Sequence, residues 1–262
     1  MIVSVELGIT GRRAMVAASS KGIGLAVAKE LAAEGCRVSL CARTESNLND
    51  AVKSIEGSVG TVCDVSRAED IERWFEQTKE RIGHPEILVT NTGGPPAGNW
   101  TEMTDVQWQD GFDSTLMNIV RLSRLVSPGM RENGWGRIVH ITSLVAKQPY
   151  DILPISSTLR AGISALTRLQ ADELARDGVT VNSVLPGHTM TDRQLHLAEV
   201  RAEQRGTTPE EALKRQAEEV PVGRLADASE IAAAVAFLCS NKAAYITGVN
   251  LLVDGGLVRA PG

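Results

Sequence analysis

Short apolar segments alternate with longer amphipathic segments along almost the whole chain. The apolar segments are rich in Val, Ile and Leu on both faces, which is typical of parallel strands that helices cover on both sides. We expect seven strands, at residues 13–17, 37–41, 60–63, 87–91, 137–142, 179–185 and 249–253. This alternation predicts that residues 1–262 form a single doubly wound α/β domain with a parallel sheet flanked by helices.

Helix signals lie between the expected strands. Ser66-Arg67-Ala68-Glu69 and Thr208-Pro209-Glu210-Glu211 each place a hydroxyl three residues before Glu, so we expect a capping box at both. Two long helices are expected at about 105–132 and 156–176. The polar stretch 192–219 is expected to form a helical lid over the carboxyl edge of the sheet, where ligands bind in such folds.

A turn of small residues follows the first expected strand and reads Ala17-Ala18-Ser19-Ser20-Lys21-Gly22-Ile23-Gly24. A helix is expected directly after it. The amides and the dipole at a helix N-terminus favour an anion, and glycine lets the backbone approach that anion closely. We therefore expect a nucleotide phosphate here, although small residues also occur in ordinary tight turns.

Composition and charge limit the possible partners. The 262 residues are 43% hydrophobic and 23% charged, with a formal net charge of -5, which argues against nucleic acid as the main partner. No apolar run approaches membrane-spanning length and no signal-peptide pattern is visible, so we expect a cytoplasmic protein that does not bind membranes. The four cysteines and the four histidines show no metal-ligand spacing, and we expect buried, reduced thiols and no metal.

The turn at 17–24 and several later segments resemble motifs of the short-chain dehydrogenase/reductase family, and they follow one another in the same order as in that family. They are the turn 17–24, Asp64-Val65, Thr90-Asn91-Thr92-Gly93, the loop Pro186-Gly187-His188-Thr189-Met190-Thr191, Tyr245-Ile246-Thr247-Gly248 and Val253-Asp254-Gly255-Gly256. This resemblance covers nearly the whole chain and implies a Rossmann fold that binds a nicotinamide cofactor. The residues it implies for cofactor binding are Ala18, Ser20, Lys21, Gly22, Ile23, Gly24, Arg43, Asp64, Val65, Asn91, Thr92, Gly93, Arg160, Pro186, Gly187, Thr189 and Thr191.

The family's Tyr-x-x-x-Lys pair is absent. Ser156 stands at the tyrosine position and Arg160 at the lysine position. In the family, the tyrosine exchanges a proton with the substrate oxygen while hydride moves to or from the nicotinamide. Serine is a much weaker acid, and arginine stays charged and cannot relay a proton as an amine can. Ser143 and Asn118 match the family's catalytic serine and asparagine, so the expected catalytic set is Ser143, Asn118, Ser156 and Arg160.

The proton source is open at this point. Tyr150, in the loop between Ser143 and Ser156, is a candidate for a displaced acid, but we favour the interpretation that it is a pocket wall or a surface ring. A water molecule ordered by Ser143, Ser156 and Asn118 is an equally plausible donor. His188 lies in the Pro-Gly loop and is expected to be held there by its backbone, while His140 is expected to be a core residue.

The end of the second strand favours NADP(H) over NAD(H). It reads Leu40-Cys41-Ala42-Arg43 and has no acidic residue before Glu45. An acidic residue there usually binds the ribose hydroxyls of NAD. Lys21 and Arg43 are instead placed to pair with a ribose 2′-phosphate.

Three function classes fit the sequence. The first is an NADP(H)-dependent oxidoreductase that interconverts a small carbonyl compound and an alcohol with a non-standard proton donor. The second is an NADP(H)-binding protein without turnover, such as a sensor or an inactive subunit. The third is a non-redox lyase or isomerase that uses the same pocket. Because the family is commonly tetrameric, the resemblance also implies a homotetramer, with a dimer as the second choice.

Overall fold

A single parallel sheet of seven strands organises residues 6–259, the part of the chain that the computed structural model describes. The strand order is β3-β2-β1-β4-β5-β6-β7. Successive strands are added on one side of β1 as far as β3 and on its other side from β4 onward, so the order reverses between β1 and β4. The strands are β1 (Arg13–Val16), β2 (Arg37–Ala42), β3 (Val59–Val62), β4 (Ile87–Thr90), β5 (Gly136–Ile141), β6 (Val179–Pro186) and β7 (Asn250–Val253). All seven lie within two residues of their predicted bounds, and the predicted fold class is confirmed.

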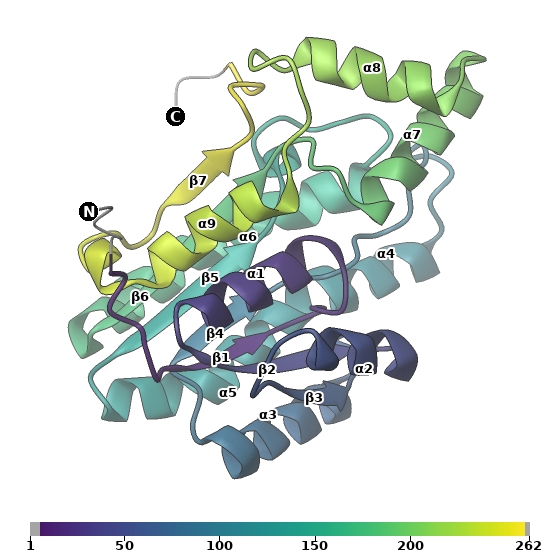
Figure 1. Ribbon diagram of the computed structural model, residues 1–262. Helices are drawn as coiled ribbons and strands as arrows, with labels where there is room; N and C mark the ends of the chain where they lie inside the picture. The colour runs from purple at the N-terminus through teal and green to yellow at the C-terminus, as the bar shows by residue number, and fades with distance from the viewer. Residues whose placement is uncertain (1–5, 260–262) are drawn as a thin grey trace.

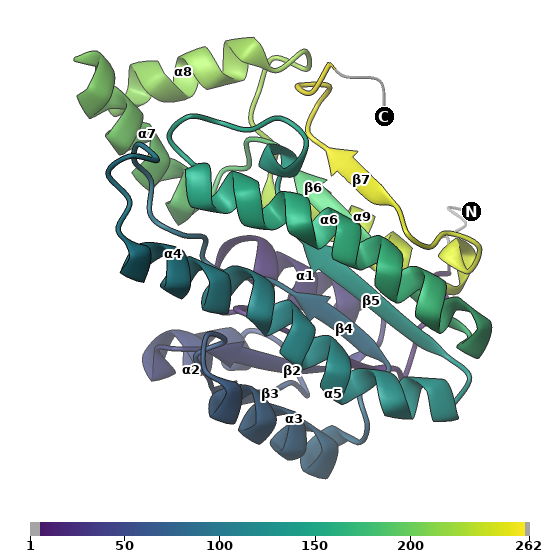
Figure 2. The same cartoon turned by 180° about the vertical axis from the view of Figure 1, so that it is seen from behind.

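Helices cover both faces of the sheet (Figures 1 and 2). One layer comprises α1 (Gly22–Ala33), α2 (Glu45–Lys53) and α9 (Ala228–Cys239), and the other comprises α3 (Ala68–Ile82), α5 (Asn118–Glu132) and α6 (Pro154–Leu174). The side chains of β1 show why both layers are needed: Ala14 and Val16 enter the first hydrophobic cluster, whereas Met15 enters the second. This period of two, with apolar residues on both faces, is the pattern of a strand buried between helices.

The predicted helix at 105–132 is not uniform. It consists of α4 (Asp105–Gly111), a π-helical segment (Phe112–Met117) and α5, which begins at Asn118. A π-helical segment inserts extra residues into a helix and is frequent at functional sites. The other long helix, α6, continues into a 3₁₀ turn at Ala175–Asp177, and further 3₁₀ turns lie at Leu144–Ala146 and Asn241–Ala243.

The stretch 192–219 forms two helices, α7 (Asp192–Arg205) and α8 (Pro209–Glu219). They lie beyond the end of the sheet to which the β7 arrow points, as both views show (Figures 1 and 2). This is the carboxyl edge, because all strands run parallel. The helices therefore lie over the edge where the sequence predicted a lid.

Of the two predicted capping boxes, one is confirmed and one is wrong. Thr208 caps α8 in a complete box with Glu211. By contrast, α3 begins after Arg67, and the Ser66 hydroxyl donates to Asp64 Oδ1 at 2.8 Å. The aspartate side chain competes for the serine, so the serine is not available to cap the helix.

Candidate functional site

A cavity of about 660 Å³ opens at the carboxyl ends of β1 to β6. The turn after β1, the ends of β2 and β3, the loop after β4 and the Pro-Gly loop after β6 all contribute to its wall. Every residue predicted for the site lines this cavity except Gly24 and Asn118. The fold thus brings together segments far apart in the sequence at the crevice where open α/β sheets bind ligands.

The turn after β1 is shaped to receive an anion. Ala18 and Gly22 both have positive φ, 46° and 53°, so the backbone turns sharply before α1. Within residues 6–259, no side chain caps α1, and its first turn contains no acidic residue. The first amides of α1 therefore suit a phosphate of a dinucleotide. The residues present fit the cofactor that the family resemblance implies.

Gly24 has a packing role rather than a contact with the cavity. A Cβ atom at this position would overlap the Ala18 carbonyl oxygen and would lie 2.8 Å from Asn91 Nδ2. The absence of a side chain lets α1 pack against the turn and against the end of β4. Gly24 does not line the cavity, so the structure does not support the prediction that it binds the cofactor directly.

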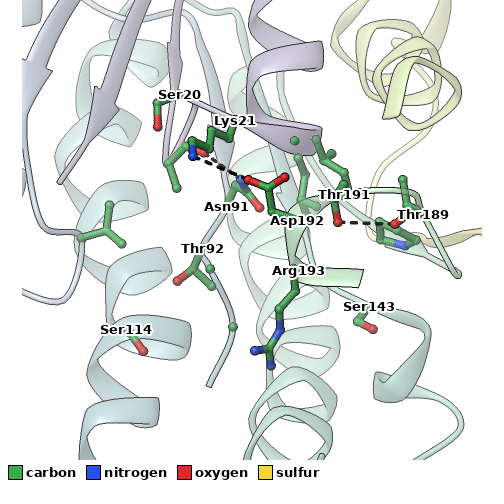
Figure 3. Close-up of a pocket in the computed structure, with 18 of the residues that line it drawn as sticks. Ser20, Lys21, Asn91, Thr92, Ser114, Ser143, Thr189, Thr191, Asp192 and Arg193 are labelled. Atoms are coloured by element: carbon green, nitrogen blue, oxygen red, sulfur yellow. Dashed lines mark hydrogen bonds and ion pairs between the residues drawn. The ribbon is translucent and has the colours of Figure 1, made fainter. Parts of the chain in front are cut away.

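The end of the cavity near β2 carries positive charge. Arg43, Thr44 and Asn47 line it, and no acidic residue from this end of β2 is among the described lining residues. Lys21 lies farther along, with its Nζ 3.6 Å from Asp192 Oδ2 at the start of α7 (Figure 3). Both side chains of this ion pair are more than half exposed, so the pair contributes little to stability and leaves Lys21 able to move.

The opposite end of the cavity contains Ser143, Ser156 and Arg160. Arg160 Nε donates to Ser156 Oγ at 3.1 Å, and Arg160 Nη1 donates to the Ile141 carbonyl oxygen at 3.3 Å. These two residues are one turn apart on α6 and both are buried. Burial, with a smaller contribution from the charge of Arg193, lowers the pKa of Arg160 to about 10, so it stays cationic at neutral pH.

Ser143 follows β5 and caps a 3₁₀ turn. Its Oγ accepts a hydrogen bond from the Val145 amide at 3.3 Å. The amide occupies one lone pair of the oxygen, so the serine's own O–H can donate to a ligand in the cavity.

Asn118 is buried but does not reach the cavity. Its Nδ2 donates to the Ser114 carbonyl oxygen, and its Oδ1 has no hydrogen-bond partner among the described residues. Ser114, one turn earlier in the π-helical segment, lines the cavity instead. Sequence reasoning missed Ser114 because a regular helix was assumed across this stretch.

Tyr150 does not line the cavity, and the structure does not support a displaced acid there. Its ring lies 6.2 Å from the His188 ring, and the Arg201 guanidinium of α7 lies 6.0 Å from its centroid. Burial raises the pKa of Tyr150, which makes it a weaker acid still. The ring is half-buried beneath α7, so it is neither a wall of this cavity nor a surface ring.

Two histidines are neutral for the same physical reason. Burial lowers the pKa of His140 to about 4, and its ring nitrogens bond to Thr90 Oγ1 and Gln170 Oε1 at 2.9 and 2.8 Å. The prediction of a satisfied core residue is confirmed. Burial also lowers the pKa of His188 to about 4, so it is uncharged in the Pro-Gly loop.

Four residues of α7 that sequence reasoning did not assign line the cavity. They are Asp192, Arg193, Gln194 and Leu197. Arg193 Nη2 donates to the Pro95 carbonyl oxygen at 2.6 Å, which joins the start of α7 to the loop after β4. The sequence signal that could have found them is Thr191, which caps α7 through the Gln194 amide and so places Arg193 in the first turn.

The described part of the chain contains neither a metal-binding cluster nor a membrane-spanning helix. In residues 6–259, no cluster of three or more His, Cys, Asp or Glu side chains could hold a metal ion. None of the described helices is long and apolar enough to cross a membrane. The four cysteines are all buried and unbridged, as predicted.

Comparisons with known proteins identify the family. The family model described as enoyl-(acyl carrier protein) reductase matches residues 17–258. A putative ketoacyl reductase of Streptomyces coelicolor is 37% identical over 250 residues, which are 93% of this chain and 96% of that protein. The chain belongs to the short-chain dehydrogenase/reductase family of oxidoreductases.

Solved structures agree with this family assignment. L-sorbose reductase from Gluconobacter frateurii, complexed with NADPH and L-sorbose, superposes with a TM-score of 0.92 at 32% identity, over 98% of this chain and 100% of that chain. A variant of actinorhodin polyketide ketoreductase with NADPH also gives a TM-score of 0.92, at 35% identity over 95% of this chain and 98% of that chain. The predicted family and fold are therefore confirmed.

Proposed function

We propose that the protein is an NADP(H)-dependent oxidoreductase that interconverts a small carbonyl compound and its alcohol without a catalytic tyrosine. The observation that carries this proposal is the hydrogen-bonded pair of Ser156 and Arg160, which is buried at the wall of the cavity that Ser143 also lines. A buried guanidinium with only neutral acceptors is costly. Such a cost is typical of a functional site and would serve no purpose in an inactivated one.

NADPH, when bound, supplies the hydride. Its phosphates would lie on the amides at the start of α1, and Arg43 would pair with the 2′-phosphate. Asn91, Thr92, Gly93 and the Pro-Gly loop would hold the nicotinamide half, since they line the cavity between the two ends.

Ser143 and Ser156 handle the substrate oxygen in this proposal. The Ser143 hydroxyl donates a hydrogen bond to the carbonyl oxygen. Ser156 Oγ accepts from Arg160 Nε, so the Ser156 O–H is oriented to donate as well. As negative charge develops on the substrate oxygen, the guanidinium stabilises it, and the proton reaches the oxygen through the Ser156 hydroxyl, which water then reprotonates.

The comparisons support this choice of reaction and cofactor. The Streptomyces relative is named a ketoacyl reductase, and both structural neighbours contain NADPH. We also propose that α7 and α8 act as a lid, because Arg193 and three neighbours on α7 already line the cavity.

The proposed function is tested by the absorbance of NADPH in the presence of a panel of ketones and aldehydes. We expect NADPH to be oxidised in a one-to-one ratio with carbonyl loss. NADPH binding without oxidation across the panel would instead support a sensor or inactive subunit. Loss of substrate at a constant NADPH level would indicate a lyase or isomerase.

Cofactor preference is predicted to depend on Arg43. Replacing Arg43 with alanine removes a charged partner of the 2′-phosphate, so NADPH affinity should fall about tenfold or more while NADH affinity stays unchanged. Fluorescence titration with both cofactors measures this. Arg37→Ala, an exposed arginine at the other end of β2, is the matched control and should alter neither affinity. Tighter NADH than NADPH binding in the wild type would refute the assignment.

Assembly stays a prediction, and we propose a homotetramer. Leu169 on α6 and Tyr245 before β7 are exposed at 67% and 103%, and the outer strand β7 exposes Leu251 at 36%. Apolar side chains on a helix face and at a sheet edge are commonly covered by another subunit. Light scattering at micromolar concentration would contradict the proposal if it gave the mass of a monomer.

A further inference from the structure

Two arginines line the substrate end of the cavity, which is the end that contains Ser143 and Ser156. Neither arginine has an acidic partner in the described part of the chain. Arg160 and Arg193 both line the cavity, and within residues 6–259 no carboxylate forms an ion pair with either guanidinium. Their hydrogen-bond acceptors are Ser156 Oγ and the backbone carbonyls of Ile141 and Pro95. All of these acceptors are neutral.

The acidic residues of the cavity lie elsewhere. Asp64 accepts hydrogen bonds from the amide and hydroxyl of Ser66, and Asp192 lies 3.6 Å from Lys21. Both are thus engaged near the nucleotide end. The substrate end carries two positive charges and no negative one among the described lining residues.

Burial acts on both guanidinium groups. It lowers the pKa of Arg193. It also lowers the pKa of Arg160, and the positive charge of Arg193 lowers that pKa further. The positive charge of Arg193 therefore acts on Arg160, and both groups line the same cavity. A bound anion between them would offset both the lost hydration and this repulsion.

Arg193 is held so that it points into the cavity. Its side chain runs from the start of α7 toward the space between Thr92 and Ser143, away from Lys21 (Figure 3). Gly94, with φ +73°, lies beside it, since a Cβ atom there would be in ordinary van der Waals contact with Arg193 Nε and Nη2, at 3.6 Å. The loop after β4 thus supports the guanidinium from one side and leaves the rest of its donors toward the cavity.

We propose that the substrate of this site carries a carboxylate in addition to the reacting carbonyl, and that Arg193 binds that carboxylate. This inference rests on the proposed function and names its substrate class. The planar fork of a guanidinium matches the two oxygens of a carboxylate. Arg160 adds positive charge and stays hydrogen-bonded to Ser156, so the carboxylate is oriented while Ser143 and Ser156 face the carbonyl oxygen.

The binding test does not depend on turnover. Protein saturated with NADP⁺ is titrated calorimetrically with pyruvate, acetoacetate and levulinate and with the methyl ester of each. We expect at least one acid to bind about tenfold tighter than its ester, and Arg193→Met to abolish that difference. Arg193→Lys, which keeps the charge but not the fork, should retain part of it. Arg215→Met, an exposed arginine of α8, is the control and should behave as wild type.

Several outcomes would overturn the inference. They are equal or tighter binding of all three esters, no binding of any acid, or binding of inorganic phosphate in an Arg193-dependent manner without binding of the acids. Loss of NADP⁺ binding in Arg193→Met would show that this arginine holds the cofactor instead, and would also overturn it.

Turnover separates this inference from the proposed function and from a merely structural role. With NADPH, Arg193→Met should raise KM for the acid about tenfold or more and leave kcat/KM for the ester within about threefold of wild type. A loss of the same size for acid and ester would mean that Arg193 only fastens α7 to the loop after β4. Arg193-dependent binding of an acid without NADPH oxidation would refute the proposed function and support the carboxylate site.

Discussion

Ser143→Ala should lower kcat/KM for carbonyl reduction by about 100-fold or more. Ser143 lines the cavity, and its Oγ already accepts a hydrogen bond from the Val145 amide, so its O–H is available to donate to a ligand. With no tyrosine beside it, this serine carries a larger share of the stabilisation of the charge on the substrate oxygen. Steady-state NADPH oxidation measures the loss, which should appear mainly in kcat because the interaction strengthens in the transition state.

NADPH affinity is the internal control for that variant. The proposed cofactor contacts are made by other residues, so fluorescence titration should give an unchanged dissociation constant. Ser54→Ala, an exposed serine at the end of α2, removes the same atom far from the cavity and should have no effect on either measurement. A fall of less than about threefold for Ser143→Ala would contradict the role given to this serine.

Arg160→Met should reduce kcat by about 100-fold without unfolding the protein. Methionine is uncharged and similar in length, so it fills the buried site while removing the hydrogen bond to Ser156 and the positive charge. Thermal stability should be equal or higher, because a buried charge without an acidic partner is costly. This combination of a catalytic loss with retained stability distinguishes a functional arginine from a structural one.

Arg168→Met on the same helix is the matched control. Arg168 is exposed and its 2.8 Å ion pair with Asp172 lies on the surface of α6. Surface pairs of this kind contribute little, so activity and stability should both stay close to those of wild type. If Arg160→Met kept full activity, the guanidinium would have no part in the reaction.

The sheet could be predicted from the sequence because its signal is local. Each strand is a short apolar run with both faces hydrophobic, and β1 shows the outcome, with Ala14 and Met15 entering opposite clusters. Helix starts were less certain. Thr208 and Ser66 share one pattern, yet only Thr208 caps a helix, because the Asp64 carboxylate bonds to the Ser66 hydroxyl.

The site could be predicted only as far as its motifs extend. The turn at 17–24, the loop after β4 and the Pro-Gly loop were all correctly expected at one edge of the sheet. Asn118 was expected to take part but is turned into the protein after a π-helical segment, which no sequence periodicity indicated. Arg193 was missed because its position depends on how α7 folds over the edge, and this is a tertiary contact with the Pro95 carbonyl.

The central claim is that Ser156 and Arg160 form a working proton-transfer site in place of Tyr and Lys. The most direct test compares NADPH oxidation by the wild type and by the double variant Ser156→Tyr with Arg160→Lys, on one panel of ketones and aldehydes. We predict measurable turnover in the wild type, and equal or faster turnover in the double variant, since the backbone keeps the family geometry. No turnover of any carbonyl by the wild type, together with an active double variant, would contradict the claim and would show a cofactor-binding scaffold without its chemistry.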